Sequence, residues 1–221
     1  MSKELKFNEK LHEYRLDKKV IPSVTQILTP ISNELYKFID KRILDAKADI
    51  GTEVHKCIEF YCNYELLPSP SEDQRVLNYF NSYLQFREDY KDQFIKTLAT
   101  EFQEYYEDEE ITYGGQIDNI TLFKDDGITL IDYKTVASLN PSLVALQEYG
   151  YKLIAEQKMH LSINKFKVLL LHEDGYELID LTHLVKEDPD TAKLFRYFYE
   201  FDKLMDEYGV KNTAIAYSEK F

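Results

Sequence analysis

Residues 166–172 read Phe-Lys-Val-Leu-Leu-Leu-His, a short and nearly all-apolar run. A run of this length suits a β-strand, whose side chains point alternately to the two faces of a sheet. Because apolar residues occupy both alternating sets, both faces of that sheet must be covered. The run therefore predicts an α/β protein with a central mixed sheet flanked by helices.

The rest of the chain divides into segments that fit this arrangement. A hairpin is expected over 5–21, followed by a short helix capped by Ser23. In the helical segment 33–65, Gly51 marks either the joint between two helices or a close packing contact. The remaining expected elements are a helix at 72–90, strands at 94–106, 111–123 and 128–135, a helix from Pro141 to about 162, strands at 166–172 and 176–181, and a helix at 190–207.

The length of 221 residues suits one domain. We expect an N-terminal hairpin and helical part over 1–92, a sheet core over 93–182 and a C-terminal helix and tail over 183–221. The first residues lack the apolar run of a signal peptide, and no segment approaches the length of a membrane span, so we expect a cytoplasmic protein without membrane contact. The spacing of Cys57 and Cys62 suits neither a disulfide nor a zinc pair.

The formal net charge is −13. Such an excess of acid counts against nucleic acid as a partner, because phosphate binding requires lysine and arginine. It does not exclude an enzyme that has only a local positive rim and uses metal ions for part of the charge. Candidates for such a rim are Lys37, Lys41, Arg42 and Lys152.

The two strands at 111–123 and 128–135 carry a concentrated set of charged residues. Between them lies an Asp-Asp-Gly turn at 125–127. If this three-residue turn has its glycine in the left-handed conformation, Lys124 pairs with Ile128 and Asp118 stands opposite Lys134. The two-residue side-chain period then directs Asp118, Asp132 and Lys134 to one face.

Two carboxylates and one lysine on strands with apolar neighbours are costly. Like charges about 4 Å apart repel by roughly 4 kcal/mol at an effective dielectric near 20. A divalent cation accounts for the surplus acid, and hard oxygen ligands favour Mg²⁺ or Mn²⁺. The same repulsion predicts that Asp132→Asn does not destabilise the metal-free protein. The alternative is a surface hairpin with a cross-strand salt bridge between Asp118 and Lys134.

The pattern of Asp118 followed by Asp132-Tyr133-Lys134-Thr135 resembles the RecB-like branch of the PD-(D/E)xK nucleases. Further motifs, in order along residues 7–160, are similar to those of phage and mitochondrial exonucleases in that branch: Pro22-Ser23-Val24-Thr25, Gly51-x-x-x-His55, Glu101 in the strand before the hairpin, and Gln147-x-x-x-Tyr151. The resemblance implies a restriction-endonuclease-like core.

By position, the resemblance implies that Asp118 and Asp132 bind metal, that Glu101 and His55 are additional ligands, and that Lys134 is catalytic. It also implies that Gln147 and Tyr151 position the substrate or the lysine. The chain lacks the four cysteines of the iron–sulfur members, so no cluster is expected. Each of these residues also has an ordinary explanation. His55 can be a packed helical histidine, and Glu101 one acid of a solvated acidic run at 101–110. Gln147 and Tyr151 can be an i,i+4 hydrogen-bonded pair.

The leading functional hypothesis is a Mg²⁺- or Mn²⁺-dependent deoxyribonuclease, exonucleolytic by resemblance, acting on single-stranded DNA or duplex ends. One alternative is a structure-specific or restriction-like endonuclease. Another is a non-catalytic acidic DNA mimic or interaction protein on the same fold. The sequence leaves oligomeric state, strand polarity and pathway open.

Overall fold

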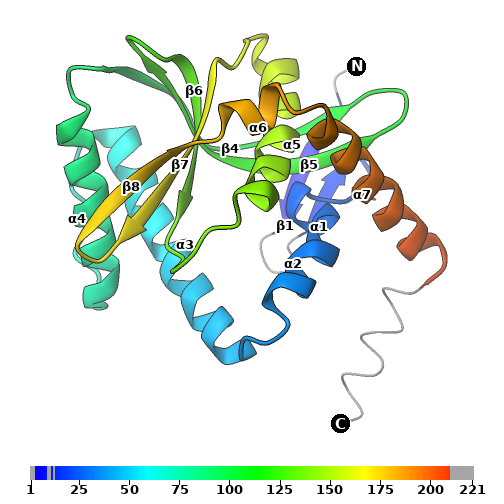
Figure 1. Cartoon of the computed structure of the whole chain (residues 1–221), viewed down its shortest axis with the longest axis horizontal. Helices are drawn as coiled ribbons and strands as arrows, with labels where there is room; N and C mark the ends of the chain where they lie inside the picture. Colours follow the sequence, from blue (N-terminus) through cyan, green and yellow to red (C-terminus); the bar gives the residue numbers. More distant parts are fainter. Residues whose placement is uncertain (1–2, 9–10, 12, 210–221) are drawn as a thin grey trace.

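The structure, a computed structural model, describes residues 3–8, 11 and 13–209. A five-stranded sheet lies at its centre, in the order β4 (Phe94–Glu107), β5 (Thr112–Phe123), β6 (Gly127–Lys134), β7 (Lys165–His172) and β8 (Gly175–Asp180). Neighbouring strands are antiparallel except β6 and β7, which are parallel. The sheet is therefore mixed, as the sequence predicts (Figure 1).

Helices cover both faces of this sheet. On one face pack α1 (Val24–Ile27), α5 (Pro141–Met159), α6 (Thr182–Lys186) and α7 (Pro189–Glu207). On the other pack α3 (Lys41–Tyr64) and α4 (Gln74–Asp89). Val168 of β7 belongs to the first core and Leu169 to the second, so the apolar run at 166–172 is buried on both sides. The prediction of an α/β protein is confirmed.

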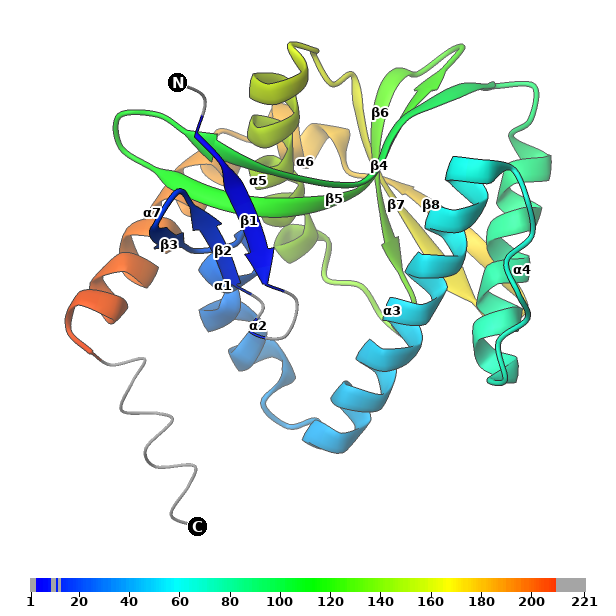
Figure 2. The ribbon, with the colours of Figure 1, turned by 180° about the vertical axis from the view of Figure 1, so that it is seen from behind.

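The N-terminal part forms a second, small sheet of β1 (Leu5–Asn8), β2 (Glu13–Leu16) and β3 (Lys19–Ile21). The predicted hairpin strands are confirmed and β3 is an addition; residues 9, 10 and 12 lie outside the described residues. The sheet packs beside β5 (Figure 2). There Tyr14 lies against Gly114, and the Gly114 N–H donates to the Pro22 carbonyl. Ser23 caps α1 through a capping box, as predicted.

The helical segment differs from its prediction at one point. The break falls between α2 (Thr29–Tyr36) and α3, whereas α3 continues through Gly51. The joint predicted there is wrong, and the alternative of a close packing contact is right. A Cβ atom on Gly51 would lie 3.3 Å from the Thr135 hydroxyl oxygen, so the glycine lets α3 approach the end of β6.

The other expected elements are present with small shifts in their bounds. The short α6 was not predicted, and residues 210–221 of the expected C-terminal tail lie outside the described residues. Cys57 and Cys62 are both free. Within residues 3–8, 11 and 13–209, no helix is long and apolar enough to cross a bilayer.

The β5–β6 register is two residues away from the predicted one. Ile128 pairs with Leu122 rather than with Lys124. Gly127 is left-handed, with φ of 70°, as predicted, but it already pairs with Phe123, so the turn begins one residue earlier. A shift of two preserves the alternation of faces, and the charged side chains stay together. The pairing of Asp118 with Lys134 is wrong.

Candidate functional site

Three carboxylates form a row across three adjacent strands. The pairs on either side of Glu101 place it opposite Asp118. One step beyond the last β5–β6 pair, Asn119–Ile131, the same register brings Asp118 opposite Asp132. Directly opposed Cβ atoms in a sheet are about 5 Å apart, so these acids are close neighbours. Asp118 and Asp132 are buried, with Asp132 only 1% exposed.

The ladder between β5 and β6 ends at this row. Beyond it, the Asp118 carboxylate accepts the Tyr133 N–H at 2.7 Å, in the place of a backbone carbonyl. The Tyr133 side chain points to the opposite face and is buried in the core beneath α3 and α4, as expected. The row therefore lies where a side chain replaces the regular sheet pairing.

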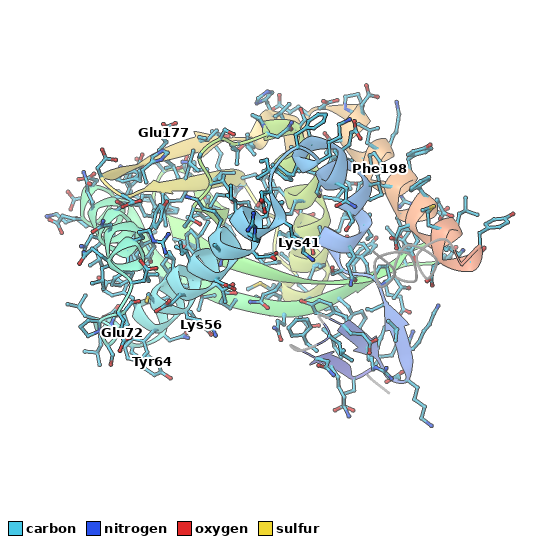
Figure 3. The ribbon with its side chains drawn as sticks, turned by 90° about the horizontal axis from the view of Figure 1, so that it is seen from below. Lys41, Lys56, Tyr64, Glu72, Glu177 and Phe198 are labelled. Carbon is cyan, nitrogen blue, oxygen red and sulfur yellow. The ribbon has the colours of Figure 1, made fainter. Side chains whose placement is uncertain are left out.

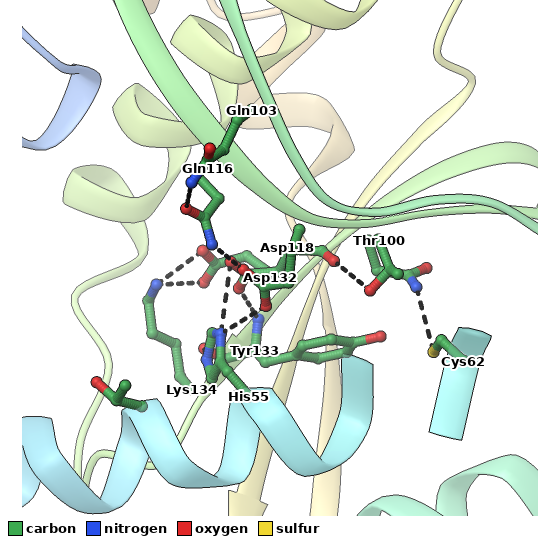
Figure 4. Close-up of polar contacts among 12 residues, drawn as sticks. His55, Cys62, Thr100, Gln103, Gln116, Asp118, Asp132, Tyr133 and Lys134 are labelled. Carbon is green, nitrogen blue, oxygen red and sulfur yellow. Dashed lines mark hydrogen bonds and ion pairs between the residues drawn. The ribbon is translucent and has the colours of Figure 1, made fainter. Parts of the chain in front are cut away.

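His55 reaches the row from α3 (Figure 4). Its Nδ1 atom is 3.3 Å from a Glu101 carboxylate oxygen and 3.7 Å from Asp118 Oδ1, and its Nε2 is 3.2 Å from the Tyr133 carbonyl oxygen. Burial lowers the pKa of His55, but the carboxylates of Asp118 and Glu101 outweigh it and raise the pKa to about 9. In the metal-free protein, His55 is therefore a cation at neutral pH.

Asp118 has the opposite balance. Burial raises its pKa most, Asp132 and Glu101 add to the rise, and the cations of His55 and Lys134 act against it, which leaves the pKa at about 7. A carboxyl group with this pKa binds a proton readily near neutral pH. Asp118 thus lies in a site whose negative charge is not fully compensated by the protein.

Lys134 forms a buried ion pair with Asp132. Its Nζ lies 2.7 Å and 2.6 Å from the two Asp132 oxygens. Burial lowers the pKa of Lys134, but Asp132 and Asp118 raise it further, so the lysine stays charged. The partner of Lys134 is Asp132 and not Asp118, and Asp118 is buried. The alternative of a surface Asp118–Lys134 salt bridge is therefore wrong.

Helix α5 supplies an amide on the other side of Asp132. Gln147 Nε2 donates to Asp132 Oδ1 at 3.0 Å and lies 3.2 Å from the Tyr151 hydroxyl. The i,i+4 pair expected from sequence is present, and Gln147 also reaches the carboxylate row. All seven predicted site residues thus lie in one connected group.

Two residues that the sequence reasoning missed complete the surroundings. Gln116, two residues before Asp118 on the same face of β5, donates to Glu101 and accepts from Gln103 at 2.6 Å (Figure 4). Glu101 has a positive φ of 46°, a backbone conformation that residues other than glycine rarely adopt. The Gln116 amide therefore fixes a carboxylate on a strained stretch of backbone.

Glu148, beside Gln147 on α5, is the other missed residue. It is fully buried, and neither carboxylate oxygen has a hydrogen-bond partner among the residues that the structure describes. Burial raises its pKa well above the usual range, and Asp132 adds to the rise. The only indication in the sequence that Glu148 belongs to the site is its position next to Gln147. A glutamate within a helix is otherwise interpreted as a solvent-facing residue.

The donor set fits a divalent cation. One ligand atom each from His55, Glu101 and Asp118 lies within 4.8 Å of the others. Asp132, also predicted as a ligand, is outside that group and is held by Lys134 and Gln147. Carboxylate oxygens suit Mg²⁺ and Mn²⁺, and an imidazole nitrogen is a better ligand for a transition metal such as Mn²⁺ than for Mg²⁺.

None of the candidate rim residues contacts this group among the residues that the structure describes. Lys37 pairs with Glu34, and Arg42 with Asp40 at 2.7 Å, on the exposed part of α2 and α3. Lys41 opens α3, and Figure 3 shows it on the same helix as Lys56. Lys152 on α5 pairs with Glu156 at 3.3 Å.

Comparison with known proteins adds little. No protein-family model matches the chain, and no curated protein matches it. Among solved structures, one titled "Crystal structure of SSO0001" aligns with 66% of this chain and 74% of its own, at 14% sequence identity and a TM-score of 0.31. A similarity this weak supports no argument about function.

Proposed function

We propose that this protein hydrolyses phosphodiester bonds of DNA with a divalent cation. The observation that carries the proposal is the row of Glu101, Asp118 and Asp132, with Lys134 paired to one end and His55 beside the other. A purely structural cluster would need fewer acids, because each buried carboxylate without its own cation costs stability. A cation bound between the acids would remove that cost.

Glu101, Asp118 and His55 would hold the cation. When bound, it would withdraw electrons from a phosphate oxygen and make a bound water more acidic. His55 must give up its proton before its nitrogen can bind metal. The remaining acid, Asp132, would stay paired with Lys134 and complete the charge balance.

The chain's own polar groups would orient the reaction. The Lys134 ammonium, held by Asp132, can hydrogen-bond the attacking water and the scissile phosphate. Gln147 holds Asp132 from the other side, so the lysine position is fixed by two elements. In the reaction the water oxygen bonds to phosphorus, the bond from phosphorus to the leaving ester oxygen breaks, and the water proton ends on that leaving oxygen.

DNA as the substrate, and cleavage from a strand end, rest on the resemblance described above. Lys41 precedes His55 by fourteen residues on α3, a helical rise of about 21 Å. A strand lying along this side of α3 would connect Lys37, Lys41 and Arg42 with the carboxylate row. Because these cations are few and two are already paired, DNA binding should weaken only gradually with salt.

The direct test is cleavage of end-labelled single-stranded, duplex and circular DNA in Mg²⁺, Mn²⁺ or EDTA. We expect cleavage with either metal, with Mn²⁺ at lower concentration, and none in EDTA. Asp118→Asn should abolish it, while Asp174→Asn, at an exposed acid in the turn between β7 and β8, should leave it unchanged.

Intact circular DNA would support the exonuclease, whereas cut circles would support the endonuclease alternative. Cleavage that persists in excess EDTA, or in Asp118→Asn, would refute the proposed site. Metal-independent DNA binding or protein binding without any cleavage would favour the non-catalytic alternative.

A further inference from the structure

Helix α7 has two apolar faces. The inner face, which includes Phe195 and Tyr199, is buried in the core against α5 and β5. The outer face carries a stripe of five large side chains that we call the outer stripe: Leu194, Tyr197, Phe201, Leu204 and Tyr208. Four of them are between 45% and 80% exposed, and Phe201 is partly exposed. Figures 1 and 2 show α7 at the margin of the molecule, with its second half extending beyond its neighbours.

The spacing of the outer stripe is regular. Its members follow one another by three, four, three and four residues, which is the heptad alternation of a helix that packs along another helix. A helix covered only by its own core needs one apolar stripe and has a polar outer surface. The outer stripe therefore fits a second helix, and α7 is already held in helical form by its inner face.

We propose that the outer stripe pairs with the same stripe of a second copy of this chain, with the two helices antiparallel. The charges beside the stripe favour this partner and direction. Lys193, which also pairs with Asp190 at 3.2 Å, flanks the start of the stripe and Glu207 flanks its end, both exposed. With Leu194 packed on Leu204 of the second copy, Lys193 lies beside Glu207 of that copy, and the pairing occurs twice by symmetry.

On the other side of the same seam, Phe198 would lie near Phe198 of the second copy, which widens the apolar contact. The unfavourable pairs are Glu200 with its own symmetry mate at the axis and Asp190 with Glu207 of the second copy. A parallel arrangement would instead place Lys193 and Glu200 opposite the apolar Phe198 and Met205, without any ion pair. The antiparallel pairing is therefore the better match for this sequence.

The contact is small. Two heptads of side chains bury on the order of 1,000 Å² in total, at the low end for a specific interface. We therefore expect a weak, reversible dimer. This inference is independent of the proposed nuclease function, because the outer stripe contributes no residue to the carboxylate row.

Sedimentation equilibrium of the full chain over a range of concentrations tests the proposal. The wild type should pass from monomer to dimer. Leu204→Glu should abolish the dimer, and Leu67→Glu, at a more exposed leucine outside α7, should not. Lys193→Glu or Glu207→Lys alone should weaken the dimer about tenfold, and the two changes together should restore it.

Circular dichroism of each variant confirms that the fold is intact. A wild type that stays monomeric at all concentrations would overturn the proposal and leave residues 210–221 or another protein as the cover of the stripe. A dimer unaffected by Leu204→Glu would place the interface elsewhere. Failure of the double charge reversal to restore the dimer would rule out the antiparallel pairing.

Discussion

Replacing Asp132 by asparagine should destabilise the metal-free protein. Repulsion within the acidic row alone predicts the opposite, since one negative charge is removed. The structure adds a buried partner: Lys134 lies 2.6 Å from Asp132, and Asp132 is 1% exposed. At that distance and an effective dielectric near 20, the attraction is about 6 kcal/mol before the cost of burying both charges. Removing one member of such a pair costs about 3–5 kcal/mol.

For Asp132→Asn we expect the lower end, about 3 kcal/mol, because Asp118 remains near the lysine and compensates in part. Lys134→Met should cost more, at least about 4 kcal/mol, because it leaves three acids with only His55 as a nearby cation. The double variant, Asp132→Asn with Lys134→Met, should be more stable than the sum of the single changes implies, with a coupling of about 2–3 kcal/mol.

Urea denaturation in EDTA at pH 7.5 measures these free energies of unfolding. The three variants should share the wild-type dependence on urea, which shows that the denatured states are comparable. An Asp132→Asn protein as stable as the wild type, or more stable, would show that repulsion in the row outweighs the ion pair. Additive effects in the double variant would show that the two residues do not interact.

Three further predictions concern neighbouring groups. The pKa of His55 rises from 6.5 to about 9 on folding, so the stability that its protonation contributes is complete below pH 6.5 and is lost as pH rises through 9. Urea denaturation of the metal-free protein should therefore show a loss of up to about 3 kcal/mol across that window. The double variant His55→Gln with Asp118→Asn should remove most of this loss. Gln116→Ala should raise about tenfold the Mn²⁺ concentration that gives half of the melting-temperature increase, because Glu101 loses its amide donor; an unchanged midpoint would show that Glu101 needs no such support. Glu148→Gln should stabilise the protein at pH 7 but not at pH 4, because the raised pKa of the buried acid favours unfolding above pH 4.5; equal effects at both pH values would contradict that reasoning.

The elements of the sheet were predictable because local signals agreed. Alternation, the turn glycine and the apolar run at 166–172 each indicated the same strands. The register was predicted two residues away, since the sequence does not show whether Gly127 belongs to the turn or already pairs with Phe123. The error left the faces unchanged, and so the grouping of Asp118, Asp132 and Lys134 survived it.

The break between the helices was less predictable. Glycine inside a helix costs only about 1 kcal/mol relative to alanine, so tertiary contacts can override it. At Gly51 the contact is with Thr135, which is 84 positions later in the chain and invisible to local reasoning. Glu148 and Gln116 were missed for a similar reason, because burial of a polar residue depends on what packs over it.

The two cationic side chains of the site, Lys134 and His55, also differ in how far the sequence alone predicts their positions. Lys134 is two residues from Asp132 on one strand, so alternation alone brings them together. His55 comes from a helix 46 positions before Glu101, and only the approach of α3 to β6 places it there. The close contact at Gly51, one helical turn before His55, sets that approach. The charge balance of the carboxylate row, and with it any capacity to bind a cation, therefore depends on a packing contact as much as on the acids themselves.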